Sequence, residues 1–265
     1  MAKNLSLSGD ESSPHRLSSV TSALRLLKVF SADESELGIT MLAQRMGLAK
    51  STIHRLTSTL VSEGFLEQNP LNEKYRLGLS LFGLGTLVRR RMNVSTEALE
   101  HLHELRDRTG ETVHLAVLEQ TDIMYLFNLE SQQAIGMRSY LGVRKPAFCS
   151  SEGRAILAFS QPTVLKRILK GALLARTPHT VTEPASLVRL LLGVAQTGYA
   201  VDDEESDAGM RGLAAPIRDA SGTVIAAVGL AGPVQRLSKK NLRSFTPWVL
   251  HAAQAISTRL GYRPD

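Results

Sequence analysis

The segment at residues 51–62 gathers hydroxyl and basic side chains within a stretch of chain that carries no acid. On a helix, its polar face would present short hydroxyls, one arginine and one histidine: Ser51, Thr52, His54, Arg55, Ser58, Thr59 and Ser62. Hydroxyl and guanidinium groups can bond phosphate oxygens or base edges, whereas a carboxylate would repel the phosphates of DNA. Across residues 38–62 the charged residues are Arg45, Lys50 and Arg55. The composition of this segment therefore favours contact with DNA.

The residues around these side chains predict a helix-turn-helix. We expect a short helix with Thr40 as its N-cap, ending at Gly47, where glycine supplies a left-handed backbone. A second helix, capped by Ser51, ends near Gly64 and carries apolar residues at helical spacing on its other face: Ile53, Leu56, Thr57, Leu60 and Val61. A helix-turn-helix places its second helix in the DNA major groove.

Two short strands follow the second helix, at residues 65–68 and 74–77, and flank a turn rich in Asn and Pro. This pattern predicts a β-hairpin that acts as a wing, with Lys74 and Arg76 beside a backbone phosphate. The alternative is an ordinary helical hairpin with a solvated polar face. The wing, the absence of acids and the basic charge favour DNA binding. The predicted DNA contacts are Thr40, Lys50, Ser51, Thr52, His54, Arg55, Thr59, Lys74 and Arg76.

The composition narrows the class of partner. The chain has 265 residues, of which 43% are hydrophobic, so it can fill one large or two ordinary cores. Aromatic residues make up only 5%, which disfavours an aromatic platform that stacks single-stranded bases. The net charge is +6, and residues 1–95 carry four of these six excess positive charges. The basic excess is thus densest where the helix-turn-helix lies, as expected for a double-stranded DNA partner.

The single cysteine, Cys149, excludes an intrachain disulfide and a cysteine-ligated zinc site. No apolar run is long enough to span a bilayer. Residues 1–16 are rich in serine and lack the apolar core of a signal peptide, so we expect a disordered lead-in. The sequence therefore predicts a cytoplasmic protein with no membrane partner.

The rest of the chain divides into segments of different character. We expect a winged helix-turn-helix domain at residues 17–78, which begins with an amphipathic helix that packs under the helix-turn-helix. A linker helix follows at residues 79–95, and its apolar side, with Leu79 and Phe82, suits dimer contacts. Residues 96–265 form the second domain.

The second domain mixes helices with strands that pair as hairpins. Residues 112–118 and 123–127 have the period of two of a hairpin, residues 211–218 and 223–230 form another, and residues 133–139 suit a third strand. Helices are expected at residues 96–109, 153–159, 162–174, 184–197 and 237–260. The predicted fold class is a mainly α winged helix-turn-helix joined by a linker helix to a GAF-like α+β domain with an antiparallel sheet.

Several short motifs occur in a recognisable order along the chain. In the first domain they are residues 51–56, Gly64 and residues 75–78, and in the second they are residues 150–158, 198–205, 214–217 and 232–233. From about residue 18 to residue 260, this order resembles the IclR (isocitrate-lyase regulator) family of bacterial transcription factors. Arg154 stands where lysine is usual in the family.

The resemblance implies a winged helix that binds palindromic operators and a second domain that binds a small organic effector. It also implies homodimers that pair into tetramers, with repressors and activators both among the members. Effector binding would change DNA affinity or oligomeric state, and we expect no catalytic site, cofactor or metal. The positions that match the family's effector cavity are Met137, Ser139, Cys149, Ser150, Asp202, Gly212, Gly229 and Ala231.

The same positions bear on the class of effector. Gly212, Gly229 and Ala231 stand where glyoxylate- and pyruvate-type members of the family carry cysteine or serine. A small keto acid would lose hydrogen bonds there, at about 1–3 kcal/mol for each buried partner left unpaired. Glycine and alanine should also make the cavity larger and more apolar. We therefore expect an aromatic or otherwise bulky effector.

Three other groups of residues could do chemistry. The acids at residues 202–205 could bind a metal ion, but neighbours in an extended loop point apart, which favours a solvated loop with one acid in the cavity. Cys149 could be a nucleophile paired with His114 or His179, but nothing in the sequence places a base near it, which favours a buried thiol. His54 has no His or Cys at ligand spacing, which favours a DNA contact over a metal ligand.

Two classes of function follow from these patterns, and we favour an effector-responsive transcription factor. The alternative is an enzyme with a GAF-like catalytic domain and a vestigial helix-turn-helix. The acid-free face at residues 51–62 separates the two classes, because an enzyme has no need to keep that face cationic.

Overall fold

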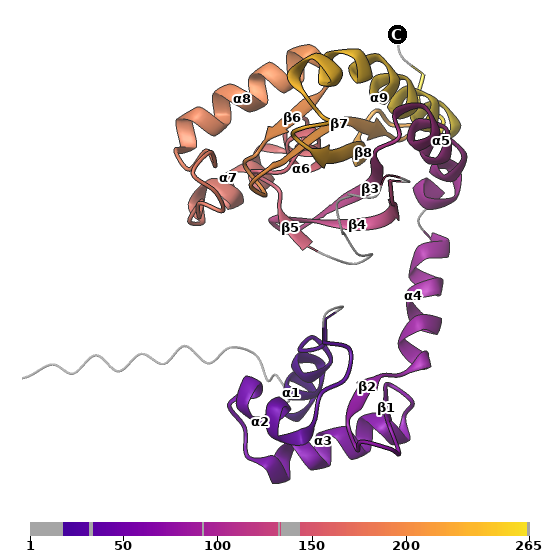
Figure 1. Cartoon of the computed structure of the whole chain (residues 1–265), viewed down its shortest axis with the longest axis vertical. Coiled ribbons are helices and arrows are strands. Elements are labelled where there is room, and N and C mark those ends of the chain that lie inside the picture. The colour runs from indigo at the N-terminus through magenta and orange to yellow at the C-terminus, as the bar shows by residue number, and fades with distance from the viewer. Residues whose placement is uncertain (1–17, 32–33, 92, 132, 134–143, 264–265) are drawn as a thin grey trace, which may run out of the picture. The chain divides into compact units, whose positions relative to one another are not determined.

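The computed structural model describes residues 18–31, 34–91, 93–131, 133 and 144–263 (Figure 1). The predicted lead-in at residues 1–16 lies outside these ranges. The chain folds as two compact units, Met1–Val88 and Arg89–Asp265. Within the described ranges, no helix is both long enough and apolar enough to cross a membrane.

The first unit is a winged helix-turn-helix, which confirms the predicted fold of this part of the chain. Its elements in chain order are α1 (Ser18–Leu27), α2 (Ile39–Met46), α3 (Lys50–Ser62), β1 (Leu66–Gln68), β2 (Tyr75–Leu77) and the start of α4 (Leu79–Arg91). Strands β1 and β2 pair antiparallel, with Glu67 opposite Arg76, and form the wing.

An apolar core holds the helices and the wing of this unit together. Helix α3 buries Ile53 and Leu60, α2 buries Leu42, α1 buries Leu26, and the wing adds Leu66. Full burial of one such side chain contributes about 1.5–3 kcal/mol. Because the apolar residues of α3 recur at helical spacing, burying them turns the polar face of the same helix outward.

The wing is tied to the segment that precedes α2. Leu37 and Tyr75 form an antiparallel bridge. Glu36 accepts hydrogen bonds from Asn72 Nδ2 at 2.9 Å and from Asn69 Nδ2 at 3.1 Å. These two hydrogen bonds lower the pKa of the Glu36 carboxyl below its ordinary value. The asparagines of the turn therefore fix the wing against the helix-turn-helix as well as turning the chain.

The two predicted N-caps are wrong. Helix α2 begins after Gly38 and α3 after Ala49, and neither residue caps its helix through a side chain. Thr40 and Ser51 are each the second residue of their helix. Gly47 takes the predicted left-handed conformation, with φ of +64°. The connection from Gly47 to α3 is short, so α3 begins at Lys50, one residue before Ser51. The Ser51 side chain stays exposed.

The second unit is an α+β fold with a curled antiparallel sheet, as predicted (Figure 1). Its elements are α5 (Asn93–Thr109), β3 (Thr112–Glu119), β4 (Asp122–Leu129), β5 (Arg144–Pro146), α6 (Ser151–Leu157), α7 (Pro162–Lys170), α8 (Pro184–Thr197), β6 (Ala200–Asp203), β7 (Met210–Arg218), β8 (Val224–Pro233) and α9 (Lys239–Arg259). The described strands lie in the order β5-β4-β3-β8-β7-β6. Each neighbouring pair is antiparallel.

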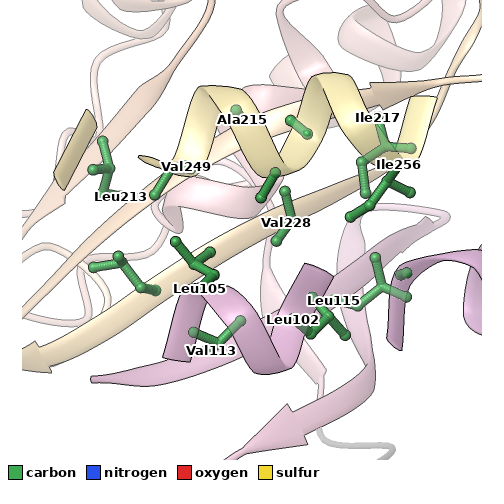
Figure 2. Packing of buried hydrophobic residues seen from close by; sticks show 14 of the residues in the cluster. Leu102, Leu105, Val113, Leu115, Leu213, Ala215, Ile217, Val228, Val249 and Ile256 are labelled. Carbon is green, nitrogen blue, oxygen red and sulfur yellow. The ribbon is translucent and has the colours of Figure 1, made fainter. Parts of the chain in front are cut away.

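Helices cover both faces of this sheet. On one face, α5 and α9 pack against alternate residues of each strand, such as Leu213, Ala215 and Ile217 of β7 (Figure 2). On the other face, α6 packs against the residues between them, such as Ala214 and Ala116, and α8 packs against α6 in the same core. The period of two along each strand thus assigns its residues to two separate cores.

The structure departs from the predicted elements at several points. Residues 202–203, expected in an acidic loop, end strand β6, because Asp202 pairs with Gly212 of β7. Helix α5 begins at Asn93, inside the predicted linker helix. Edge strand β5 was not predicted, because three residues carry too short a pattern. The expected third strand at residues 133–139 lies almost wholly outside the described residues.

Leu230→Ala should destabilise the second unit by about 2–5 kcal/mol, because truncation of a buried leucine removes apolar contacts and leaves a cavity. The Leu230 side chain is fully buried in the core between the sheet and helices α5 and α9. Trp248, the chain's single tryptophan, lies on α9, so its fluorescence during urea unfolding reports on this unit.

The control for this change is Leu192→Ala, which truncates a leucine that is 60% exposed on α8. It should shift stability by less than about 0.5 kcal/mol. Equal unfolding midpoints for the two variants would contradict the packing described for Leu230.

Candidate nucleic-acid interface and ligand cavity

The polar face of α3 is exposed along its whole length. Ile53, Thr57 and Leu60 point into the core, and Thr57 Oγ1 donates a hydrogen bond to the backbone oxygen of Ile53 at 3.0 Å. The exposed polar residues are Lys50, Ser51, Thr52, His54, Arg55, Ser58, Thr59 and Ser62. The structure thus brings together on one surface the α3 residues that were predicted to contact DNA.

Three hydroxyls on this face, those of Ser58, Thr59 and Ser62, bond within their own helix, whereas the side chains of Lys50 and Arg55 do not. Thr59 Oγ1 donates to the backbone oxygen of Arg55 at 3.0 Å, and Ser58 Oγ lies 3.5 Å from His54 Nδ1. In the part of the chain that the structure describes, Lys50 and Arg55 form no ion pair. Their charges are therefore available to a phosphate or a base.

The remaining predicted DNA contacts lie on α2 and the wing. Thr40 is exposed in the first turn of α2, and Lys74 is exposed just before β2. Arg76 is already paired, with Glu67 across the hairpin at 2.9 Å and with Glu36 at 3.8 Å. Exposed ion pairs contribute only about 0–1 kcal/mol, so a phosphate can replace these acids at little cost.

A small cavity lies in the second unit where the N-terminus of α6 meets the sheet. Its volume is about 10 Å³, which leaves room for about one water molecule. The lining residues come from strands β4 to β8, the loop after β6 and the start of α6: Tyr125, Lys145, Ser150, Ser151, Glu152, Asp202, Ser206, Asp207, Met210, Arg211, Gly212 and Ala231.

The predicted effector positions fall into three groups. Ser150, Asp202, Gly212 and Ala231 line the cavity. Cys149 and Gly229 belong to the same region of the fold but are not among its lining residues. Met137 and Ser139 lie outside the described residues.

Neither Gly212 nor Gly229 stands beside empty space. A Cβ atom at Gly212 would lie 2.5 Å from Ser151 Oγ. A Cβ atom at Gly229 would lie 2.8 Å from the Cβ atom of Ala214 and 3.0 Å from Glu152 Oε1. Ser151 of α6 therefore lies in the space that a side chain at Gly212 would need, and Ala214 of β7 and Glu152 of α6 border the space at Gly229.

The cavity wall contains a buried acid that sequence reasoning did not single out. Glu152 is only 2% exposed, and its Oε1 lies 3.3 Å from His114 Nδ1. His114, on β3, is buried and stacks on Tyr125 with 4.4 Å between ring centroids. A signal was present, because Glu152 is the one acid among residues 147–159, which are otherwise mainly small or apolar.

Two of the acids at residues 202–205 are buried. Asp202 lines the cavity, as expected for one acid of this segment, whereas the solvated loop predicted for the others is wrong for Glu205. Asp202 Oδ1 accepts hydrogen bonds from the backbone N–H groups of Glu205 at 2.8 Å and Ser206 at 3.2 Å. Burial raises the pKa of the Asp202 carboxyl to about 6. Glu205 accepts two hydrogen bonds of 2.5 Å from the Arg154 guanidinium. Both acids hold the loop in place.

The other two acids of this segment have partners of their own. Asp203 pairs with Arg211 at 2.5 Å and with Lys239 at 3.2 Å. Glu204 Oε2 accepts a hydrogen bond from the Gly209 backbone N–H at 3.0 Å. Among the residues that the structure describes, no group of three or more His, Cys, Asp or Glu residues is placed to hold a metal ion.

Cys149 is a buried thiol. It is fully inaccessible, and its Sγ donates to the Pro146 carbonyl oxygen at 3.6 Å. Burial raises the pKa of the thiol to about 12. A thiol with so high a pKa is protonated at neutral pH and is a poor nucleophile. The geometry therefore favours the structural role for Cys149 over the catalytic one.

These features together define a DNA-binding transcriptional regulator: an exposed, acid-free second helix in a winged helix-turn-helix, and in the same chain an α+β unit with a polar cavity. Comparison with known proteins agrees. Residues 19–70 match the IclR helix-turn-helix domain, and residues 86–258 match the bacterial transcriptional regulator IclR C-terminal domain. The chain belongs to the IclR family of bacterial transcriptional regulators.

The chain is similar to members of this family over nearly its whole length. It is 34% identical over 247 residues to the HTH-type transcriptional regulator KdgR of Escherichia coli, covering 92% of this chain and 94% of that protein. For XynR of the same organism, the identity is also 34% over 247 residues, with 93% and 98% covered. These relatives are regulators in a family of non-enzymes, which sets the enzyme alternative aside.

A solved structure supports the same assignment. An IclR homologue from Microbacterium hydrocarbonoxydans, in complex with 4-hydroxybenzoate, matches with a TM-score of 0.81 and 30% sequence identity. The match covers 91% of this chain and 98% of that one. The likeness to this structure therefore extends over both units, beyond the individual motifs.

Cys149 should react very slowly with dithionitrobenzoate at pH 8 in the native protein and rapidly once the protein is unfolded in guanidinium. The reason is that a buried thiol with a pKa of about 12 supplies almost no thiolate. Absorbance of the released thionitrobenzoate measures the rate, and Cys149→Ser supplies the blank. Stoichiometric reaction of the native protein within seconds would show an activated, accessible thiol instead.

Proposed function

We propose that this regulator recognises a specific double-stranded operator through the exposed face of α3, and that a small organic effector in the second unit controls this binding. The observation that carries the proposal is the α3 face itself, with its hydroxyls, Arg55 and His54 exposed and no acid among them. Membership of the IclR family supports the proposal. We place the protein in the cytoplasm, with its DNA.

We assign roles on α3 by position along the helix. Lys50 and Ser51 stand at its N-terminus, where no side chain caps the backbone N–H groups, and this arrangement suits a phosphate. Thr52, Arg55 and Thr59 are spaced three and four residues apart, so they share one side of the helix. We assign them to base edges, with Arg55 suited to a bidentate contact with guanine.

The other predicted contacts are assigned to orientation on the duplex. We propose that Thr40 and Lys74 bond backbone phosphates on either side of α3. His54 is proposed to make a further DNA contact next to that of Arg55. Arg76 would exchange Glu67 for a phosphate. Such contacts fix the register of the protein on DNA and add affinity that falls as salt rises.

We propose further that the protein works as a homodimer and that dimers pair into tetramers. Helix α4 leaves a run of large apolar side chains exposed within the first unit: Leu79, Phe82, Leu84 and Leu87. Exposed apolar groups gathered in this way mark an interaction surface. A second copy is the fitting partner, because a palindromic operator presents two equivalent half-sites.

The effector is proposed to bind beside α6, where Ser150, Asp202, Gly212 and Ala231 meet. The 4-hydroxybenzoate complex of the M. hydrocarbonoxydans homologue supports binding of a small organic molecule by a protein of this kind. The class of effector that we propose is the one expected from the sequence, an aromatic or otherwise bulky compound, with hydrogen-bonding groups that meet the polar lining.

Arg55→Ala should weaken operator binding by about 1–3 kcal/mol and reduce the preference for operator over unrelated DNA, if Arg55 reads a guanine. If Arg55 contacts only phosphate, binding should weaken evenly on all sequences. Fluorescence anisotropy with labelled operator and scrambled duplexes at one fixed salt concentration distinguishes the two outcomes.

The matched control is Arg189→Ala, which removes an arginine that is exposed on α8 of the second unit. Both affinities should stay unchanged in this variant. Operator affinity that is equally unchanged in Arg55→Ala would refute the role assigned to Arg55.

Phe82→Asp should shift the protein towards monomers in sedimentation velocity at micromolar concentration. The change removes apolar burial of about 1.5–3 kcal/mol and places a charge in the proposed interface. Leu174→Asp is the matched control, because Leu174 and Phe82 are each 72% exposed. A dimer that persists in Phe82→Asp would rule out this surface of α4 as the interface.

A further inference from the structure

We propose that a groove between α1 and α3 in the first unit binds a small amphipathic anion, with an aromatic ring system and one carboxylate. The rings fill the groove, and Arg55 holds the carboxylate. This site is separate from the cavity beside α6. It rests on the proposed function only for its consequence, that the ligand competes with operator DNA for α3.

The groove has the size and the lining of a small-molecule site. Its volume is about 610 Å³, within the range of about 300–1,000 Å³ that ligand sites commonly have. Its lining comes from α1, the turn before α3 and α3 itself, all of them in the first unit. The apolar part of this lining consists of Val20, Ala23, Leu48, Leu56 and Leu60.

The sequence of α1 explains why the groove forms. Helix α1 packs against α3 (Figure 1) and inserts Leu26, which is fully buried, into the core of the unit. Ser19 and Ser22 precede Leu26 by seven and four residues, so they lie on the same side of α1. They and Ala23 line the groove. Because their side chains are small, α1 does not fill the space over α3 there.

One edge of the groove exposes an apolar side chain to water. Val20 lines the groove and is 51% exposed. Covering apolar surface of this kind is favourable for any ligand with an apolar body. The apolar lining therefore accounts for the ring system of the proposed ligand.

The α3 wall of the groove supplies the polar half of the site. Arg55 lies in this wall between Thr52 and Thr59. Within the described residues Arg55 forms no ion pair, and the described residues that line the groove include no acid. A guanidinium group can bind a carboxylate through two parallel hydrogen bonds. The charge of this wall therefore selects an anion.

Other occupants match only part of this lining. The surface of α4 proposed for self-association, at residues 79–87, is apolar but contains no acid for Arg55. The DNA backbone has the charge but no apolar body to cover Val20. An amphipathic anion matches both parts of the groove, and aromatic rings beside the ion pair exclude water and strengthen it.

A ligand in this groove would occlude part of the surface proposed to read DNA. Thr52, Arg55 and Thr59 line the groove, and they are the side chains assigned to base edges. Ligand and operator therefore use the same guanidinium group and exclude each other. This route acts within the first unit and needs no signal from the second.

Fluorescence titration of the full-length protein tests the site with three probes. Dansylglycine has aromatic rings and a carboxylate, dansylamide has the rings without the charge, and N-acetylglycine has the carboxylate without the rings. We expect one dansylglycine per chain, dansylamide binding about tenfold weaker, and no displacement of dansylglycine by N-acetylglycine. Absence of saturable dansylglycine binding, or equal affinity for dansylamide, would overturn the proposal.

Two substitutions locate the bound probe. Arg55→Gln removes the charge and should weaken dansylglycine about tenfold while leaving dansylamide little affected. Val20→Glu places a carboxylate in the groove and should weaken dansylglycine at least as much. Leu192→Glu is the matched control, because Leu192 on α8 is 60% exposed, and it should leave both affinities unchanged.

Far-ultraviolet circular dichroism checks that each variant folds. Full dansylglycine affinity in folded Arg55→Gln and Val20→Glu would place the probe elsewhere, in the cavity beside α6 or between subunits, and would overturn the proposal. If one variant does not fold, the other variant and the comparison of dansylglycine with dansylamide decide it.

The last step adds operator DNA to the dansylglycine complex. The duplex should displace the probe and lower its emission, and a probe that stays bound beside the operator would overturn the competition. A protein that shifts its operator in a gel but binds no dansylglycine overturns only the groove site. A protein that binds dansylglycine through Arg55 but binds no DNA overturns operator recognition and leaves the groove site standing.

Discussion

The close approach of α6 to its neighbours is the constraint on which the second unit depends. Gly153 sits where a Cβ atom would overlap Ala147, and Gly229 of β8 leaves room for a side chain of the same helix. Packing this close leaves little free volume, and polar groups in fixed positions line what remains. Arg154, from the same helix, holds Glu205 and with it the loop after β6. Removing one partner of such a buried ion pair lowers stability by about 3–5 kcal/mol. This ion pair therefore holds α6 and the loop after β6 together.

The exposed face of α3 in the first unit uses its charges in the opposite way. In the second unit, buried cations such as Arg154 have acid partners, and their charges serve to fix the structure. On α3, Lys50 and Arg55 face solvent, and within the described residues no acid pairs with either. A cation without a protein partner is free to meet a phosphate, and the attraction is strong at low salt and screened at high salt. The exposed cationic face of α3 therefore suits a polyanion, whereas the paired charges of the second unit fix the loop beside its cavity.

Local patterns in the sequence predict much of the fold, whereas the cavity depends on contacts between distant segments. Pro184 at the first turn and Gly198 beyond the last set the ends of α8, and the predicted and observed bounds agree. The caps expected at Thr40 and Ser51 failed because each helix begins before its hydroxyl residue, directly after Gly38 or Ala49. The place of Glu152 in the cavity wall could not be predicted from spacing, since it depends on how α6 lies against strands far away in sequence. For the same reason, the sequence could not show that Ser151 lies against Gly212 and that Ala214 and Glu152 lie against Gly229.

The central claim, that α3 and the wing recognise a specific operator, is tested most directly by a gel shift. The probe is the intergenic DNA upstream of the protein's own gene, and the mixture contains an excess of unrelated duplex. We predict a discrete complex that survives this competitor and weakens steadily as the salt concentration rises. The absence of any complex, even at low salt, would contradict the claim.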